Sequence, residues 1–237
     1  MVEVKRGILK LSGELFGTKE NHIDSNRYSE VAEQLIEIQN ITRIQLAMVV
    51  GGGNIYRGRE AGSEVDHTEA DSMGMLATIM NGIGLRDALV RYGATNTRLM
   101  TSISIPQFAE PYIRTKGRYH LDNNRMVIIA GGLGIPNFST DSAVAQYGDE
   151  LQCRMIFKAS TVDGVYDCDP KKNGNAKKYS QITFQEALDR RLKVMDATAF
   201  TMCENSGIPI FVFNINDLHR LPEIIGGDYS FGTLISR

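Results

Sequence analysis

The chain has 237 residues, a formal net charge of −2 and 42% hydrophobic residues, which is typical of one large folded domain or two closely joined lobes. This charge gives no overall basic field for nucleic acid, and no apolar run resembles a secretion signal or reaches the roughly 18 residues of a membrane span. We therefore expect a soluble cytoplasmic protein whose cysteines, Cys153, Cys168 and Cys203, remain reduced, because their spacing matches no zinc or redox motif.

Short apolar runs alternate along the chain with segments of helical periodicity. We predict strands at 8–11, 44–50, 98–101, 125–130, 155–158 and 210–213, and helices from about residue 28 and at 68–92, 142–151, 184–190 and 197–205. This alternation predicts an α/β fold, a three-layer αβα sandwich around a mainly parallel sheet. A turn-prone run at 122–124 suggests a division into lobes of 1–125 and 126–237 within a single domain.

The predicted helix at 68–92 carries an apolar stripe. Its members are Met73, Met75, Leu76, Ile79, Met80, Ile83 and Leu85. A stripe at this spacing usually packs against the sheet or against another subunit, and a binding groove is the alternative.

Three predicted strands end in glycine beside a cation or hydroxyl groups. They are the segments 8–14 (ILKLSGE), 46–58 (LAMVVGGGNIYRG) and 127–143 (VIIAGGLGIPNFSTDSA). In an open α/β sheet, ligands bind outside the carboxyl ends of the strands, and glycine lets backbone N–H groups approach phosphate oxygens closely. The sequence therefore predicts one shared crevice that binds phosphates.

Two cations accompany the first two of these junctions. Lys10 interrupts an apolar strand, and a charge there is costly unless it emerges beside an anion or, as the alternative, lies on an exposed edge strand. Arg57 follows Gly51, Gly52 and Gly53 and offers a planar fork of donors to a phosphate. Without Arg57, the three glycines would indicate only a tight turn.

The third junction leads into a predicted helix. Ser139 and Thr140 supply hydroxyl groups beside the glycines, which favours an anion, although Thr140 as an N-cap and Asp141 as a first-turn acid is a simpler interpretation. Both interpretations can hold together.

A fourth polar segment follows the strand that ends at Lys158. In the turn-rich loop 160–170, Tyr166 is a candidate for stacking on a base, and Asp169 for accepting hydrogen bonds or holding a metal-bound water. Neither a P-loop nor a GxGxxG fingerprint occurs, and HExxH and GxSxG are absent too, which argues against P-loop kinases, dehydrogenases and the common hydrolases.

Six motifs together carry a resemblance that spans nearly the whole chain. They are KLSGE (10–14), GGGNIYRG (51–58), DSMGMLATIMNG (71–82), STDSA (139–143), VDGVYDCDP (162–170) and KVMD (193–196). In this order they resemble the bacterial uridylate kinases of the amino acid kinase superfamily. The resemblance implies an acetylglutamate kinase-like fold, transfer of the γ-phosphoryl group of ATP to UMP in pyrimidine biosynthesis, Mg²⁺ with the ATP, and a homohexamer.

The resemblance also implies which residues bind each nucleotide. We assign the first lobe to UMP, the phosphoryl acceptor, and the second to ATP, although each implied set of residues includes members of both lobes. The implied ATP-binding residues are Lys10, Leu11, Ser12, Gly13, Gly53, Arg57, Ser160, Tyr166 and Asp169. The implied UMP-binding residues are Gly52, Asp71, Leu133, Gly134, Ile135, Pro136, Asn137, Phe138, Ser139 and Thr140. No residue is assigned to a metal site of the protein itself.

We take three residues of these junctions as catalytic. Lys10 would stabilise charge on the transferring phosphoryl group, Arg57 would hold phosphates, and Asp141 would orient Lys10 or neighbouring donors. Lys158 and Asp196 are further candidates for the same network.

The chain departs from the family pattern in two places. At 17–24, GTKENHID replaces a glycine-rich stretch associated with GTP activation, so the sequence does not predict that activation. In the base loop, Leu133, Ile135 and Asn137 stand where many relatives have Thr, Asn and Phe, which shifts recognition of uracil toward backbone groups.

Two other functions remain as alternatives. A kinase of the same superfamily that acts on a carboxylate or carbamate would share Lys10, but it would require cations for an amino acid in place of Asp71. A nucleotide sensor without catalysis is the second alternative, and its expected mark is the loss of Lys10 or Asp141, both of which are present.

Overall fold

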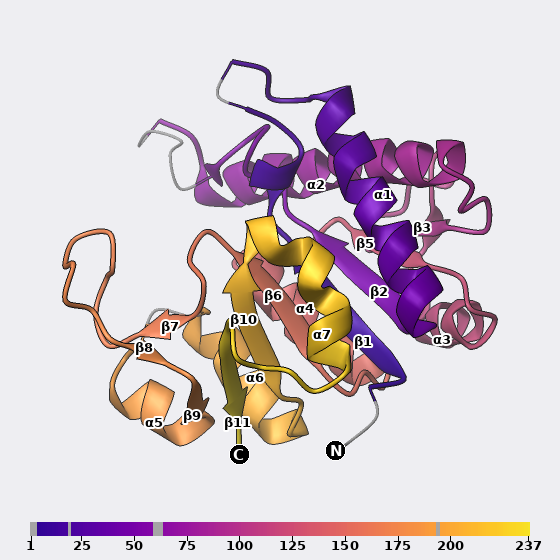
Figure 1. Ribbon diagram of the computed structural model, residues 1–237. Helices are drawn as coiled ribbons and strands as arrows, with labels where there is room; N and C mark the ends of the chain where they lie inside the picture. The colour runs from indigo at the N-terminus through magenta and orange to yellow at the C-terminus, as the bar shows by residue number, and fades with distance from the viewer. Residues whose placement is uncertain (1–3, 19, 59–63, 193–194) are drawn as a thin grey trace.

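The computed structural model describes residues 4–18, 20–58, 64–192 and 195–237 (Figure 1). In this part of the chain the helices are α1 (Ser25–Thr42), α2 (His67–Arg91), α3 (Arg114–Asp122), α4 (Thr140–Glu150), α5 (Phe184–Asp189), α6 (Ala197–Ser206) and α7 (Leu221–Ile225), with 3-10 helices η1 (Gly13–Leu15) and η3 (Ile215–Arg220). The strands are β1 (Arg6–Leu11), β2 (Gln45–Val50), β3 (Arg98–Thr101), β4 (Glu110–Pro111), β5 (Val127–Ala130), β6 (Ile156–Ser160), β7 (Val165–Tyr166), β8 (Lys178–Tyr179), β9 (Gln181–Thr183), β10 (Ile210–Asn214) and β11 (Thr233–Ser236).

One large sheet forms the centre of the molecule. Among the described residues it has nine strands in the order β4-β3-β5-β2-β1-β6-β10-β11-β9, and every pairing is parallel except that of β10 with β11. The β7–β8 hairpin is separate. All six predicted strands lie in the large sheet. Because β1, β2, β5 and β6 are parallel neighbours, their carboxyl ends meet at one edge.

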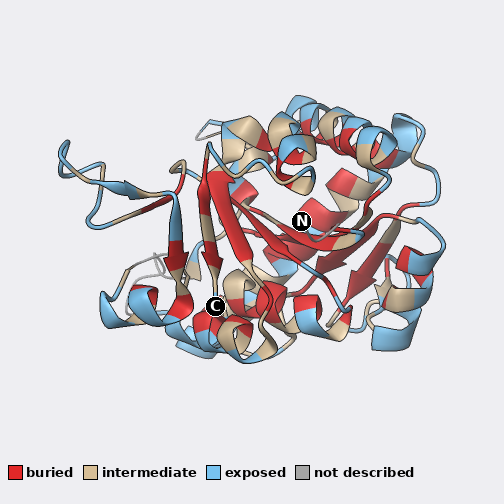
Figure 2. Cartoon of the chain, turned by 60° about the horizontal axis from the view of Figure 1, so that its bottom comes forward, coloured by how far each residue is buried: buried red, intermediate tan, exposed pale blue. Residues whose placement is uncertain are grey.

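Helices cover the two faces of this sheet as separate groups. Side chains of α1, α2 and α7 share one buried cluster with the strand residues Leu9 and Phe157. Side chains of α3, α4, α5 and α6 share a second cluster with Ile8 and Ile156, because successive residues of a strand point to opposite faces. Figure 2 shows the buried strands between helices whose outer faces are exposed. The predicted three-layer αβα sandwich is confirmed.

The apolar stripe of α2 divides between core and surface. Ile79 and Leu85 are buried, and Ile83 packs against the core. Three members of the stripe remain exposed, namely Met73, Leu76 and Met80. Packing against the sheet is therefore confirmed for the buried members, and packing of the exposed members against another subunit stays a prediction.

Several short elements were not predicted. Helix α3 buries Gly117, His120 and Leu121 but is otherwise polar, so its apolar period is weak.

Helix α1 begins at Ser25 and not near residue 28, because the side chain of Asp24 accepts a hydrogen bond from the Asn26 N–H and caps the helix. No helix in the described ranges is both long and apolar enough to cross a membrane.

The proposed lobe boundary falls just before β5. This strand pairs with β2 on one side and β3 on the other, so it extends the sheet of residues that precede it in the sequence. The division into lobes at 125 and 126 stays a prediction.

Candidate functional site

The first two glycine junctions touch each other. The Gly51 N–H donates to the Leu11 carbonyl at 2.8 Å, which places the end of β2 beside the end of β1. A Cβ atom on Gly13 would lie 2.7 Å from the backbone nitrogen of Gly53, a distance that no side chain can adopt. Glycine at residue 13 is therefore required for the two loops to approach.

The third junction is fixed by three hydroxyl groups from other elements. The Gly131 N–H donates to Thr78 Oγ1 of α2 at 2.7 Å, and Ser102 Oγ donates to the Gly131 carbonyl at 2.7 Å. The hydroxyl of Tyr147 in α4 donates to the Gly132 carbonyl at 2.8 Å. These positioning residues were missed by the sequence analysis, although a threonine inside the apolar pattern of α2 was a usable signal.

Two lysines lie side by side at the carboxyl end of the sheet. Lys10 of β1 and Lys158 of β6 are partners in the parallel register, and β1 is a central strand, which excludes the edge-strand alternative. Both side chains point to the face covered by α4, because Ile8 and Ile156, two residues earlier, belong to the buried cluster on that side. Adjacent like charges are unfavourable without an anion between them.

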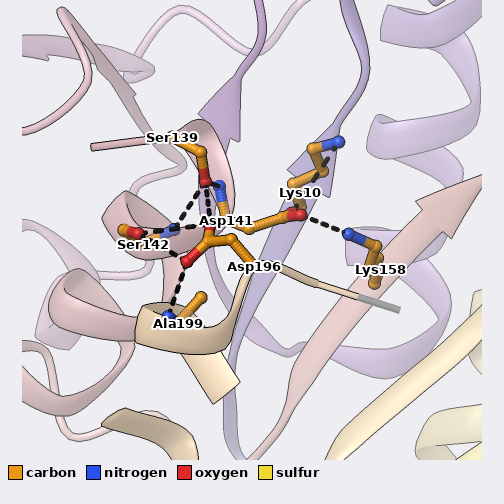
Figure 3. A network of polar contacts seen from close by, with 7 residues as sticks. All are labelled: Lys10, Ser139, Asp141, Ser142, Lys158, Asp196 and Ala199. Carbon is orange, nitrogen blue, oxygen red and sulfur yellow. Dashed lines mark hydrogen bonds and ion pairs between the residues drawn. The ribbon is translucent and has the colours of Figure 1, made fainter. Parts of the chain in front are cut away.

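Asp141 supplies that anion (Figure 3). Its Oδ2 atom accepts a hydrogen bond from the Lys158 ammonium at 2.6 Å, and its Oδ1 atom lies 3.9 Å from the Lys10 ammonium. Oδ1 is buried and has no hydrogen-bond partner among the described residues. Asp141 therefore holds Lys158 directly and keeps Lys10 within range of a weaker ion pair.

Burial changes the pKa of one of these two lysines. The Lys158 side chain is only 8% exposed, and burial lowers its pKa, which Asp141 raises in part and Lys10 lowers further. Lys10 is more accessible, with 18% of its side chain exposed. The arrangement presents one buried and one reachable ammonium at the end of the sheet, which suits a polyanion.

A second carboxylate, Asp196, joins the starts of two helices (Figure 3). It accepts hydrogen bonds from the hydroxyl of Ser139, from Ser142 Oγ at 3.2 Å and from the Ala199 N–H at 2.8 Å. Partial burial would raise the pKa of Asp196, but these hydrogen bonds lower it overall. The N-terminal ends of α4 and α6, both with positive helix dipoles, thus meet at one point.

Ser139 is the N-cap of α4, and this corrects the expectation for Thr140. The Ser139 hydroxyl accepts hydrogen bonds from the Asp141 and Ser142 N–H groups, while Thr140 is already the first helical residue. The expected place of Asp141 in the first turn is confirmed.

Three cavities surround this network, and we name them first, middle and far. The first, of about 520 Å³, is lined by Gly52, Gly53, Tyr56, Gly58, His67, Ala70, Asp71, Gly74, Met75, Thr78, Gly132, Ile135, Asn137, Phe138, Ser139, Thr140, Asp196 and Thr198. Seven of the residues predicted to bind UMP are in this lining. The other three, Leu133, Gly134 and Pro136, belong to the same loop but are not in the lining as described.

The middle and far cavities continue from the first. The middle cavity, of about 620 Å³, is lined by Ser139, Asp141, Ala187, Leu188, Arg191, Leu192, Met195, Asp196, Ala197 and Phe200. The far cavity, of about 570 Å³, includes the predicted ATP-binding residues Ser160, Tyr166 and Asp169. Ser139 and Asp196 line both the first and middle cavities, and Arg191 and Leu192 line both the middle and far cavities. The three cavities therefore adjoin one another in a row, which we call the path.

Asp71 anchors the loop across the first cavity. Its Oδ2 atom accepts a hydrogen bond from the Asn137 N–H at 2.7 Å and lies 3.6 Å from Nδ1 of His67. Asn137 has a left-handed backbone, with φ of 69°. Asp71 thus joins α2 to the loop that the sequence analysis assigned to the base, and it also lines the cavity.

Arg57 connects the first two glycine junctions. Its Nε atom donates to the Gly53 carbonyl at 2.8 Å, and Nη2 forms an ion pair with Glu14 Oε1 at 2.7 Å. Of the other residues predicted on this side, Leu11 is fully buried and its carbonyl accepts the Gly51 N–H, and Ser12 makes no side-chain cap at η1.

Two predicted groups of the far cavity already have partners in the protein. The Tyr166 hydroxyl donates to Asp163 at 2.5 Å, which raises the pKa of Tyr166 to about 12. Asp169 Oδ1 accepts from the Lys171 N–H at 3.0 Å and closes a turn. No group of three or more His, Cys, Asp or Glu side chains in the described ranges is arranged to hold a metal ion.

The sequence model of the amino acid kinase family matches residues 5–214. The chain belongs to the amino acid kinase family. The fold and family expected from the six motifs are thereby confirmed.

Three solved structures are similar to this member of the amino acid kinase family. The UMP kinase of Bacillus anthracis is 36% identical with a TM-score of 0.94, and the match covers 98% of this chain and 96% of that one. The UMP kinase of Ureaplasma parvum is 34% identical with a TM-score of 0.92, and the match covers 100% of both chains. The uridylate kinase of Archaeoglobus fulgidus, 23% identical with a TM-score of 0.73 over 97% of this chain and 99% of that one, shares the fold.

One of the six motifs and the departing stretch at 17–24 fall partly outside the described residues. Lys193 and Val194 of KVMD lie outside them, and so does Lys19 of the 17–24 stretch that departs from the family pattern. The part of KVMD that the structure describes places Asp196 in the network of Figure 3.

Proposed function

We propose that this protein transfers the γ-phosphoryl group of ATP to UMP and forms UDP and ADP. Membership of the amino acid kinase family and the likeness to two UMP kinases support this proposal. The observation that carries it is the Lys10–Asp141–Lys158 network, because Asp141 lines the middle cavity and lies beside the Ser139 and Asp196 side chains shared with the first.

The two nucleotides occupy opposite ends of the path in this proposal. UMP fills the first cavity, where the Asp71 carboxylate accepts hydrogen bonds from ribose hydroxyls and the loop 133–140 encloses the base. ATP extends from Tyr166 and Asp169 in the far cavity toward Asp141 in the middle cavity. The transferring group then lies near the strand ends, where the glycine amides, Arg57 and Lys10 meet it.

The transfer needs no general base. The second pKa of a phosphate monoester is about 6, so the acceptor oxygen of UMP is already anionic near neutral pH. This oxygen forms a bond to the γ-phosphorus as the bond from that phosphorus to the β–γ bridging oxygen breaks, and ADP leaves. Lys10 neutralises charge on the transferring group, while Asp141 holds the two ammonium groups in place.

Mg²⁺ would accompany ATP and add charge neutralisation at its phosphates. The described residues suit this mode, in which Mg²⁺ is bound by phosphates with one or two carboxylates at most. Asp141 Oδ1 is a buried oxygen without a hydrogen bond to the described residues, but two ammonium groups flank its carboxylate, and Asp196 already accepts several hydrogen bonds. No three-acid cluster is present in the described ranges.

The structure also bears on the alternative functions. A kinase for an amino acid would need a cation in place of Asp71, whereas Asp71 lines the first cavity, where it can accept hydrogen bonds from ribose hydroxyls. A sensor without catalysis would have no need of the buried Lys158–Asp141 pair, whose desolvation is costly. Both observations favour a nucleotide kinase.

The proposal also covers the location of the enzyme, its pathway and its assembly. We place the enzyme in the cytoplasm, where its three free cysteines would stay reduced, and in pyrimidine biosynthesis. We also propose a homohexamer, with the exposed residues Met73, Leu76 and Met80 of α2 at a subunit contact, because such an apolar stripe is unusual on a free surface.

A coupled assay of ADP release tests the proposed function. ATP is combined with UMP, CMP, acetylglutamate or aspartate in turn, and the reaction with UMP is repeated with GTP or UTP added. We expect UMP to be the preferred acceptor and Lys10→Ala to lower kcat about 100-fold, since loss of one preorganised donor typically costs this much. Turnover of Lys10→Ala close to wild type, with an unchanged melting temperature, would overturn the role of Lys10.

A further inference from the structure

Arg191 lies just beyond α5, at a position to which the motifs assign no role. Its side chain lines both the middle and the far cavity, and Leu192 is the other residue that the two described linings share. A ligand that extends from Tyr166 toward Asp141 therefore passes Arg191. Its backbone is left-handed, with φ of 51°, a conformation that costs energy for any residue with a Cβ atom.

The guanidinium of Arg191 is exposed and has no partner among the described residues. Within the described ranges its side chain forms no hydrogen bond and no ion pair. Its neighbour Arg190 differs, because the Arg190 Nη1 atom donates to the Tyr179 hydroxyl at 3.1 Å and the guanidinium lies 5.7 Å from the centre of that ring. The protein thus fixes Arg190 and leaves the Arg191 guanidinium available to a ligand.

The charges that line the middle cavity indicate what the Arg191 guanidinium would bind. Its described lining holds two carboxylates, Asp141 and Asp196, and one side chain that is always cationic, Arg191. A polyphosphate that enters this cavity needs a cation on the side away from Lys10. A guanidinium offers two parallel N–H donors to phosphate oxygens, which an ammonium cannot do.

We propose that Arg191 binds the phosphate chain of ATP where the nucleotide passes from the far to the middle cavity. This inference rests on the proposed function, from which ATP is taken as the donor. It makes Arg191 a substrate-contacting residue that favours a nucleoside polyphosphate over a nucleoside.

The test compares Arg191→Ala and Arg191→Lys with Arg43→Ala. Arg43 is a matched control, since it is an exposed arginine in the left-handed region, with φ of 57°, at the C-terminal end of α1 and outside the described linings of all three cavities. Alanine carries the same backbone penalty at both positions. Binding of ATP, ADP and adenosine is measured by calorimetry without UMP, and KM values for ATP and UMP are measured in the coupled assay.

We expect Arg191→Ala to weaken ATP binding and raise the KM for ATP about tenfold, the lower end for loss of a hydrogen bond to a charged group. Adenosine binding and the KM for UMP should change less than about twofold, and Arg191→Lys should retain part of the ATP affinity. ATP affinity of Arg191→Ala equal to that of Arg43→Ala would overturn the inference, and so would an equal loss for adenosine.

The proposed function and the inference about Arg191 can be contradicted independently of each other. If the wild-type protein binds ATP but does not phosphorylate UMP, the proposed function is wrong, and a dependence of ATP binding on Arg191 still supports the inference. If UMP is phosphorylated and Arg191→Ala behaves as Arg43→Ala, only the inference is wrong. Thermal unfolding of both alanine variants checks that each is folded.

Discussion

At the scale of single residues, the site depends on one carboxylate shared by two lysines. Lys10 and Lys158 are register partners on adjacent strands, and their repulsion is offset by Asp141, whose two oxygens face one ammonium each. A bound polyphosphate would add negative charge at the same place. The two ammonium groups are thus already held in position before an anion binds, which is the preorganisation that phosphoryl transfer requires.

Asp141→Asn tests this balance through its pH dependence. Burial, aided by Lys10 and opposed by Asp141, holds the pKa of Lys158 below the ordinary lysine value of 10.5. Between the lowered folded-state pKa of Lys158 and 10.5, the unfolded state binds more protons than the folded state, so this contribution to stability rises with pH in that window. Asp141→Asn lowers the pKa further, and we expect a loss of about 3 kcal/mol at pH 7 that shrinks at pH 9.5.

Urea unfolding of wild type and Asp141→Asn at the two pH values measures this difference. The double variant with Lys158→Met is the control, because it removes the titrating ammonium and should remove the extra pH dependence. An equal loss of stability at pH 7 and pH 9.5 in Asp141→Asn would contradict the prediction.

At the scale of elements, the site is built where two helices begin. Asp196 caps α6 and also accepts hydrogen bonds from Ser139 and Ser142 at the start of α4. The positive ends of both helices therefore face the boundary of the first and middle cavities. Neither helix end would be placed so accurately by its own cap alone.

Ser139→Ala separates capping from function when it is compared with Thr183→Ala. Thr183 caps α5 in a capping box with Glu186 and lies outside the described linings of the three cavities. Each variant should lose about 1 kcal/mol of stability in urea unfolding. Only Ser139→Ala should also lower kcat, roughly tenfold, because it releases Asp196 and shifts two cavity walls. Equal turnover of the two variants would exclude a positioning role for Ser139.

At the scale of the whole molecule, the outer face of α2 is the surface that we propose contacts another copy of the chain. Met73, Leu76 and Met80 are 46%, 52% and 47% exposed, on the helix whose inner side carries Thr78 and lines the first cavity. Assembly through this face would fix α2 from outside and support the cavity from behind.

Leu76→Lys tests the assembly. A charge in an apolar subunit contact should dissociate the oligomer, so the particle mass from light scattering should fall below that of wild type. Ile113→Lys is the control, since Ile113 is 47% exposed and precedes α3, which packs on the opposite face of the sheet. A wild-type protein that is already monomeric, or an unchanged mass for Leu76→Lys, would contradict the proposed contact.

The sequence by itself determined the layers of the fold and the edge of the sheet that carries the site. Apolar period and glycine punctuation are local signals, so the strands ending near Leu11, Val50 and Ala130 were predictable, and so was their meeting point. Short elements such as α3 and β11 were not, because their form depends on packing against distant residues.

Lys10, Asp141 and two further candidates were placed in one network from the sequence, but which of these side chains pair was visible only in the folded chain. Strand register set Lys10 beside Lys158, and Asp196 reached Ser139 across 57 residues of sequence. The position of Arg191 between two cavities likewise has no local sequence signal. The physical reason is that periodicity fixes the face to which a side chain points, whereas its partner across the sheet or between helices depends on long-range packing, which no local pattern encodes.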